Sequence, residues 1–513
     1  MTFKKRIITV LMIACVVAAI YSVSRIGLPV NQEGEEQEIE DSLFGHRETL
    51  YLWYTDEALT DYLNSVAVSY NEFQQEVRVI PVYTSGLEYL ETINQASLQS
   101  EEVPDLYIVG NDSLEKAYLA GLASEIKIPD GVFGLEAMFP ATSVNAVTYH
   151  EKQIGYPLYF ETSSFLYNKT YLEDWARAQI EAEIDAAEGE AAQEEADHET
   201  PEESDAVEPV EITEVDEAAV AARVEDTLPK TINDILSFAD VYDAPEQVEV
   251  FKWDVSDIFY NYFFVGNYID VGGRAGDQAS SINIYNENAI RCMRVYQNLN
   301  QFFSIDTVEI SYADVLQDFI DGRIVYTVVT TDALAKIEEA KANGDFQYEY
   351  GTSLIPDINE ELVSKSLSVT QCVVINGYSV HKDMANDFAV YLSCYNESVN
   401  NLYDRTGKLP ALKGVDISNP NAEAFIREYE KSSPNPKMIE TSNYWVELEI
   451  AFARIWDGED ANAELRSLSE KIMTQITGEA YEEDYIDVPE EVDEEEDSEE
   501  LSEDADTDEQ DTN

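Results

Sequence analysis

The sequence predicts an α/β protein, in which strands and helices alternate along the chain. Short apolar or alternating segments, typical of strands, are followed by longer segments whose apolar residues recur at helical spacing. Turn residues such as Pro104 and Gly121 bound these segments. The chain has 513 residues, of which 44% are hydrophobic, and is long enough for two or more domains with sizeable cores.

The folded body is expected to begin near Thr49, and its first elements alternate strictly. Strands are predicted over residues 49–54, 77–83 and 104–110. Helices are predicted over residues 61–73, 87–97 and 113–122. This alternation indicates parallel strands joined by crossover helices, and such domains bind ligands at the carboxyl ends of their strands.

The N-terminus carries three cations, Lys4, Lys5 and Arg6, before an apolar run over residues 7–23. The run is just long enough to cross a bilayer, and the positive charge before it predicts that the rest of the chain is exported. We expect residues 1–24 to be an uncleaved membrane anchor and residues 25–48 to be a spacer. The alternatives are a signal peptide cleaved further on, and a lipoprotein signal that ends at Cys15.

The formal net charge is -73, and much of it is concentrated in two segments. Residues 173–227 hold 21 acidic and 2 basic residues, and residues 479–513 hold 20 acidic residues and no basic one. We expect a mobile acidic insertion and a disordered acidic tail, because neither segment has a repeating apolar face to bury. The remaining residues still carry a charge of -34, which argues against a nucleic-acid partner.

The cysteine and histidine patterns do not indicate a metal site, a cofactor or a catalytic centre. Cys292, Cys372 and Cys394 lack CxxC spacing and are expected to be small buried hydrophobes, although one pair could still form a disulfide. His150 and His381 are isolated, and the sequence contains no nucleophile elbow, HExxH or phosphate-binding loop. We therefore expect that this protein is not an enzyme. Glycoside hydrolysis stays open as an alternative, because it needs only two carboxylates.

Residues 155–169, GYPLYFETSSFLYNK, predict a half-buried strand that carries one carboxylate, Glu161, among aromatic residues. A carboxylate on an apolar strand costs free energy unless a partner satisfies it. The segment therefore favours a binding crevice over a plain core, although an internal hydrogen bond would also satisfy Glu161.

Motifs spread over residues 50–476, outside the acidic insertion, occur in the order typical of one protein family. They are LWYTD at 52–56, PD at 104–105, GLASEI at 121–126, YP at 156–157 followed by Glu161, YNK at 167–169, PKT at 229–231, DFIDGR at 318–323, YG at 350–351, LIP at 354–356, TGKLPALK at 406–413 and SNYW at 442–445. In this order the chain resembles the extracellular solute-binding proteins of ABC transporters, in the sugar-binding group that includes maltose-binding protein.

The resemblance implies two α/β lobes that close by a hinge around a ligand, as in a periplasmic binding protein. It implies chain crossings between the lobes near residues 159–162 and 354–357. The expected divisions are lobe 1 over 49–160 and 356–408, lobe 2 over 161–355 with the insertion 173–227, C-terminal helices that pack on lobe 2 over 409–478, and the tail over 479–513. It also implies that the protein binds a small-molecule solute, a sugar, that its partner is an ABC transporter permease, and that it is a monomer.

The resemblance further implies which residues hold the ligand. The matching carboxylates are Asp56, Asp112 and Glu161, and the matching stacking ring is Trp445. Sugars suit such a set, because they have a polar rim and apolar ring faces. Trp253 is a weaker candidate without a fixed register, as are Asp254 and Asp257. Helix capping by Asp56 or Asp112, and a core position for Trp445, are the simpler interpretations.

Two family tryptophans are absent from this chain. Val109 stands at one of these positions, and Asp332 stands at the other and so joins the candidate ligand-binding residues. The resemblance therefore implies a cleft that is more acidic and less aromatic than that of maltose-binding protein. Such a cleft leaves a different sugar, an amino sugar or a cationic solute such as a polyamine open as ligands.

Overall fold

The computed structural model describes residues 47–99, 103–129, 131, 133–197, 215–395, 399 and 401–489. The predicted anchor, the alternative lipid site at Cys15, nearly all of the predicted spacer and residues 490–513 lie outside the described residues. Within the described residues, no helix combines the length and the apolar character needed to span a membrane.

Ten strands of the described residues form one sheet, with the central order β2-β1-β3-β10-β6-β8-β7. The strands are β1 (Glu48–Tyr54), β2 (Val77–Tyr83), β3 (Leu106–Gly110), β6 (Tyr156–Asn168), β7 (Glu249–Phe251), β8 (Ile324–Thr330), β9 (Tyr350–Ser353), β10 (Leu367–Ile375), β11 (Leu409–Pro410) and β12 (Ser433–Pro434). Off the central path, β9 and β11 pair with β6, and β12 pairs with β10. A separate hairpin joins β4 (Thr148–Tyr149) and β5 (Lys152–Gln153).

Lobe 1 is built on β1, β2 and β3, which are parallel, and on β10, which runs antiparallel to β3. Its helices are α3 (Thr60–Phe73), α4 (Tyr89–Gln99), α5 (Leu114–Leu119), α6 (Leu135–Met138), α7 (Ala141–Val147), α15 (Lys382–Cys394) and α17 (Leu402–Thr406). The predicted alternation of strands and helices is confirmed here. The predicted helix over 113–122 is shorter than expected, because a 3-10 turn over Asn111–Ser113 precedes α5.

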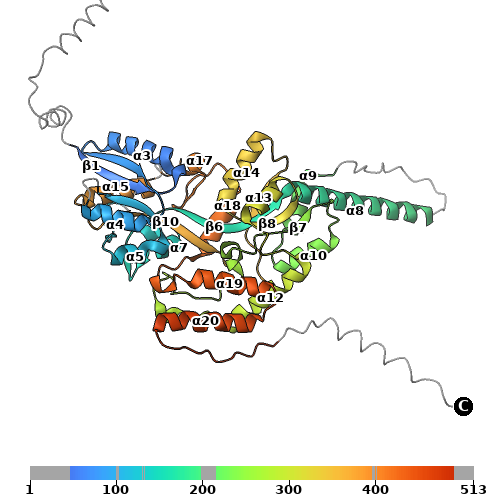
Figure 1. The fold of residues 1–513 in the computed structure, drawn as a ribbon. Helices are drawn as coiled ribbons and strands as arrows, with labels where there is room; N and C mark the ends of the chain where they lie inside the picture. The colour runs from blue at the N-terminus through green and yellow to red at the C-terminus, as the bar shows by residue number, and fades with distance from the viewer. Residues whose placement is uncertain are drawn as a thin grey trace, which may run out of the picture.

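Lobe 2 surrounds β7, β8, β9 and the second half of β6 (Figure 1). Its helices are α10 (Ile232–Val241), α11 (Ile258–Asn261), α12 (Glu287–Phe303), α13 (Tyr312–Ile320), α14 (Asp332–Asn343), α19 (Tyr444–Trp456) and α20 (Ala461–Thr477). The packing of α19 and α20 on α12 buries Tyr296 and Trp456. The mixed α/β, two-lobed architecture expected from the sequence is therefore present.

Strand β6 passes through both lobes. Its residues up to Thr162 pair with β10, and its residues from Ser163 onward pair with β8. The strand is buried on both faces, with only Glu161 and Tyr167 partly exposed along its length. The strand is present, but the prediction that it is half-buried is wrong, because α7, α15 and α18 (Ala422–Lys431) all pack against it.

Residues 409–434 also differ from expectation. They were predicted to pack on lobe 2, but β11 pairs with β6 at Phe160, and β12 pairs with β10. Helix α18 lies along β6, while α19 and α20 do pack on lobe 2. The physical reason is the apolar face of α18, where Phe425 and Tyr429 are buried against the centre of the sheet.

The described parts of the acidic insertion are helical, and the prediction that the insertion has no apolar face to bury is wrong for its second helix. Helix α8 (Lys169–Asp197) projects from lobe 2, and α9 (Glu217–Thr227) packs against it (Figure 1). Two ion pairs join them, from Arg177 to Glu217 at 2.9 Å and from Arg223 to Glu183 at 3.0 Å. Ala and Glu have high helix propensity, and α9 buries Val220 and Val224.

The first part of the predicted acidic tail packs on lobe 2. Residues 479–489 lie across α12 and α20, and Val488 is buried. Arg294 donates to the carbonyl oxygens of Val488 and Pro489 at 3.0 and 2.9 Å, and Asn462 donates to the carbonyl of Ile486. The prediction of a disordered tail from residue 479 is therefore wrong for these residues.

Candidate functional site

Three of the predicted ligand-binding carboxylates lie on one edge of lobe 1. Asp56 follows β1, and Asp112 follows β3; these parallel strands end at the same edge, because Leu52 pairs with Leu106. Glu161 lies on β6 opposite Val369 of β10. A Cβ atom on Gly110 would lie 2.7 Å from the Asp112 carboxylate and 3.5 Å from the Val369 side chain. The fold therefore brings Asp56, Asp112 and Glu161 to the same region.

Lys408 joins two of these acids. Its Nζ lies 2.9 Å from Asp56 Oδ2 and 3.5 Å from Glu161 Oε1, and 5.5 Å from the ring centre of Tyr159. Burial alone would lower the pKa of Lys408, but the two carboxylates outweigh burial and raise it. Burial and the same two carboxylates raise the pKa of Tyr159. The ammonium therefore offsets much of the negative charge at this part of the site.

Lys408 is a site residue that was not predicted from the sequence. It lies within the family-like segment at 406–413, but its partner Glu161 is 247 residues away. No local pattern links the two positions, because their contact exists only after β11 pairs with β6.

Asp56 and Asp112 differ in how far their own lobe satisfies them. Asp56 accepts a hydrogen bond from the Ala58 amide at 3.0 Å and caps a short 3-10 helix, so the capping interpretation also holds. No side-chain hydrogen bond caps α5. Asp112 is exposed; desolvation of its carboxyl by neighbouring groups raises its pKa, although hydrogen bonds from Ser113 act to lower it.

On lobe 2, Asp332 opens α14 and is already bonded within its own lobe. Tyr312 donates to Asp332 Oδ1 at 2.9 Å, Thr330 also donates to this oxygen, and Lys336 Nζ lies 2.5 Å from Oδ2. Burial alone would raise the pKa of Asp332, but Lys336 and the two hydroxyl groups outweigh it and lower the pKa. Asp332 is therefore an ionised, paired carboxylate.

An aromatic pair lies beside Asp332 and was also missed from the sequence. The rings of Tyr260 and Tyr312 are stacked, with centres 4.5 Å apart and planes at 20°. Tyr312 is half-buried and Tyr260 is buried. The pair supplies aromatic surface near the position where the family tryptophan is replaced by Asp332.

Trp445 and Trp253 occupy different environments. Trp445 is half-buried in the first turn of α19, edge-on to Tyr262 at 5.5 Å. Trp253 is 0% exposed, its Nε1 donates to Asn261 at 2.8 Å, and its ring stacks on Phe251. The expectation that Trp253 offers a stacking face to a ligand is wrong, because both its ring faces and its donor are satisfied in the core.

Asp254 and Asp257, the two weaker candidate acids near Trp253, make hydrogen bonds to nearby residues of their own segment. Asp254 is buried and accepts hydrogen bonds from the amide and hydroxyl of Ser256 at 2.8 and 2.6 Å. Asp257 caps α11 through the Phe259 amide at 2.8 Å, and burial raises its pKa. Asp257 keeps an exposed side chain, whereas Asp254 does not.

A cavity of about 440 Å³ lies between α14 of lobe 2 and α17 of lobe 1. Its lining includes Ala335, Glu338, Arg405 and Asn419. The predicted ligand-binding residues do not line it, although Gly407, which does, directly precedes Lys408. The cavity therefore borders the site described above without containing its carboxylates.

The sequence profile of the bacterial extracellular solute-binding proteins matches residues 67–425. Among curated proteins, none matches the chain. The fold is similar to that of an extracellular solute-binding protein from Staphylococcus aureus in complex with maltose, at 17% identity and a TM-score of 0.65, over 84% of this chain and 98% of that one. A cyclo/maltodextrin-binding protein complexed with maltotetraose gives 17% identity and a TM-score of 0.64, over 84% of this chain and 98% of that chain.

A third solved structure is the maltose-binding periplasmic protein from Listeria monocytogenes, also in complex with maltose. It gives 18% identity and a TM-score of 0.63, over 85% of this chain and 100% of the other. At identities this low, the structural similarity shows a shared fold and nothing more. The family profile spans most of the chain, from lobe 1 through lobe 2 to α18. The chain therefore belongs to the bacterial extracellular solute-binding protein family.

Proposed function

We propose that this protein is an extracytoplasmic receptor that binds a carbohydrate between its lobes and delivers it to an ABC-type permease. The observation that carries the proposal is the continuity of the site across β6. Ser163 lies two residues after Glu161 and pairs with Thr330, and the Thr330 hydroxyl donates to Asp332. The ionic group of lobe 1 and the aromatic pair of lobe 2 therefore adjoin neighbouring positions along one crossing strand.

These groups suit a sugar. The ammonium of Lys408 and the carboxylates of Asp56 and Glu161 can donate to and accept from hydroxyl groups. The rings of Tyr312 and Trp445 are partly exposed and can pack on the apolar face of a pyranose. The maltose and maltotetraose named in the similar structures make a neutral oligosaccharide the first ligand to test.

A cationic solute is the alternative ligand, and the ion pairs argue against it. Lys408 offsets Asp56 and Glu161, and Lys336 offsets Asp332. A glycoside-processing enzyme is the alternative activity. We propose binding without catalysis, and turnover of a glycoside that is lost in Glu161→Gln would contradict this.

The first test is a thermal-shift and calorimetric screen of malto-oligosaccharides, monosaccharides, amino sugars and polyamines. We expect at least one neutral sugar to raise the melting temperature, because a ligand that binds only the folded state stabilises it. Stabilisation by polyamines alone would contradict the carbohydrate proposal.

Trp445→Ala and Glu161→Ala are expected to abolish binding of the sugar found in that screen without unfolding the protein. Both side chains are partly exposed, and Trp445 packs only on the outside of the lobe 2 core, so their loss lowers stability without unfolding the protein. Circular dichroism checks the fold and calorimetry checks the binding. Trp253→Phe is the contrasting variant: it is expected to lower stability and to leave the dissociation constant unchanged.

The membrane anchor over residues 1–24 is proposed from the sequence alone, as is a monomeric state. Carbonate extraction of membranes from cells that express the full chain tests the anchor. Retention of Cys15→Ser in the membrane fraction would support an uncleaved anchor, and its loss would support lipidation at Cys15.

A further inference from the structure

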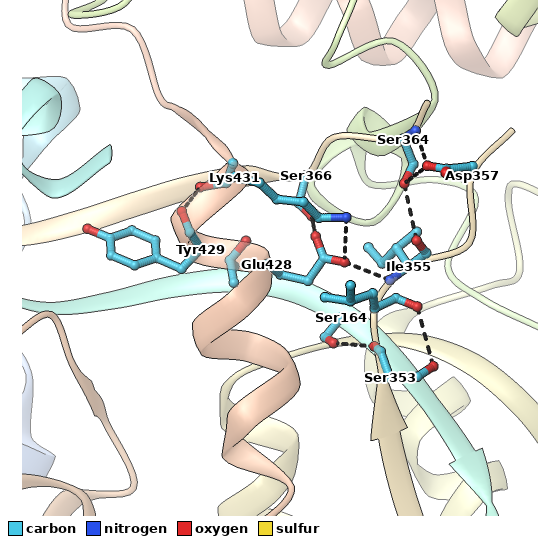
Figure 2. A network of polar contacts seen from close by, with 12 residues as sticks. Ser164, Ser353, Ile355, Asp357, Ser364, Ser366, Glu428, Tyr429 and Lys431 are labelled. Carbon is cyan, nitrogen blue, oxygen red and sulfur yellow. Dashed lines mark hydrogen bonds and ion pairs between the residues drawn. The ribbon is translucent and has the colours of Figure 1, made fainter. Parts of the chain in front are cut away.

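The second crossing between the lobes runs from Ser353, at the end of β9, to Leu367, at the start of β10, and its Ile355, Ile358 and Leu362 pack in the core of lobe 2. Both ends of this crossing are held by one carboxylate. Glu428 Oε1 accepts a hydrogen bond from the Ile355 amide at 2.7 Å, and its Oε2 accepts one from the Ser366 hydroxyl at 2.7 Å. Figure 2 shows Glu428 reaching from α18 toward both positions.

Glu428 is 0% exposed. Burial raises its pKa, while Lys431, whose Nζ lies 3.2 Å from Oε1, and the two hydrogen bonds act in the opposite direction. A buried carboxylate is not needed for packing alone, because apolar residues of similar volume often give equal or greater stability. Its position at the two ends of a crossing indicates a role beyond packing.

The next residue of α18 attaches the helix to lobe 1. The Tyr429 ring stacks on Phe160 of β6, with centres 3.9 Å apart and planes at 3°. Its hydroxyl lies 2.8 Å from Ser143 Oγ and 2.7 Å from Thr370 Oγ1. Tyr429 therefore attaches α18 to lobe 1, and Glu428, the residue before it, binds both ends of the second crossing. The helix also packs on β9 of lobe 2.

We propose that Glu428 is a positioning residue that sets the angle between the lobes and thereby the affinity for ligand. The inference rests on the proposed function, in which the lobes close around a carbohydrate. The measured dissociation constant of such a receptor includes the population of the binding-competent arrangement. Release of the crossing from Glu428 spreads the population over more lobe angles, so less of the protein is ready to close.

The test compares Glu428→Gln with Glu430→Gln, an exposed glutamate two positions further along the same helix. A glutamine at 428 keeps the size but loses the charge and one of the two acceptor oxygens. With the sugar that binds the wild-type protein, we expect Glu428→Gln to raise the dissociation constant by roughly tenfold, and Glu430→Gln to leave it unchanged. A fall in melting temperature with an unchanged dissociation constant would overturn the proposal, because a purely structural bond affects free and bound protein equally.

A second measurement needs no ligand. The distance between the lobes is measured with two spin labels, one on Leu119→Cys in lobe 1 and one on Val308→Cys in lobe 2. These substitutions replace side chains that are 63% and 90% exposed. We expect a broader distance distribution in Glu428→Gln than in the wild type. An unchanged distribution would overturn the proposal. If the wild type binds no sugar, the proposed function fails, and this distance measurement still decides the role of Glu428.

If Glu428→Gln does not fold, Ser366→Ala replaces it as the test variant. It removes one of the two bonds and leaves the carboxylate with Ile355 and Lys431. The same broadening, with a rise in the dissociation constant of roughly threefold, is expected. Distances and affinity equal to those of the wild type would count against a role in positioning.

Discussion

At the scale of single residues, Lys408 changes the charge of the candidate site, because its ammonium lies between Asp56 and Glu161. Counted from the sequence alone, the cleft has four candidate acids and no cation. In the folded protein Lys408 and Lys336 pair with three of these acids, Asp56, Glu161 and Asp332. The site is therefore less anionic than its composition implies, which favours a neutral ligand.

Lys408→Met is expected to weaken binding of a neutral oligosaccharide roughly tenfold and to increase the affinity for spermidine. The methionine removes the cation and leaves Asp56 and Glu161 as a pair of unbalanced carboxylates. Calorimetry with both ligands checks this, with Lys413→Met, an exposed lysine just beyond β11, as the control. Sugar and spermidine affinities that match the control would show that Lys408 does not shape the site.

At the scale of elements, the contact between α14 and α17 joins the two lobes beside the site. Gly407 ends α17 with a φ of +71°, and a Cβ atom there would lie 2.8 Å from the Ala335 Cβ of α14. Glycine is therefore needed at this position both for its backbone conformation and for the close approach of the two helices. The next residue is Lys408, so this approach also places the ammonium.

Gly407→Ala and Gly414→Ala form a matched pair, because both glycines have a φ of +71° but no atom lies within 4 Å of a Cβ on Gly414. Gly414→Ala should lower the free energy of unfolding by about 1 kcal/mol, from the left-handed backbone alone. Gly407→Ala should cost at least about 1 kcal/mol more and also weaken sugar binding, because α14 has to move. Urea unfolding and calorimetry measure both effects, and equal losses in the two variants would contradict the prediction.

At the scale of the whole molecule, a loop of lobe 2 touches lobe 1 away from β6. The Asp277 carboxylate accepts from the His150 amide at 2.7 Å, and the Lys437 amide donates to the Gly276 carbonyl at 3.0 Å. Lys437 is 1% exposed, and its Nζ donates to the carbonyl oxygens of Asn145, at 3.2 Å, and Ala275. A buried lysine therefore holds this contact between the lobes.

Burial lowers the pKa of Lys437 from 10.5 to about 8, although the nearby Asp277, Cys372 and Glu115 act to raise it. Between about pH 8 and 10.5 the unfolded chain binds more protons here than the folded one, so stability rises with pH in this window. Lys437→Met removes this dependence. Its free energy of unfolding relative to the wild type should fall by about 2 kcal/mol between pH 7 and pH 9.5. Chemical unfolding at both pH values measures this, and a constant difference would contradict it.

Local patterns of the sequence determined the elements of lobe 1 and the class of the fold. The strand predicted over 77–83 matches β2, and the helix predicted over 61–73 matches α3 to within one residue. These elements could be predicted because the spacing of apolar residues within each segment is a local property of the sequence. The order of short motifs likewise sufficed to assign the family, because that order does not depend on contacts.

Only the tertiary structure decided the partners of the site residues. Lys408 reaches Glu161 across 247 residues, and Trp253 lies in the core with its donor satisfied by Asn261. The acidic insertion, expected to have no apolar face to bury, forms α8 and α9, and these two helices pack against each other. Burial and charge pairing arise between segments far apart in the chain, and no local period encodes them. The sequence therefore determined the class of the fold and the family, while the packing of the two lobes around β6 decided which candidate acids are paired with a cation.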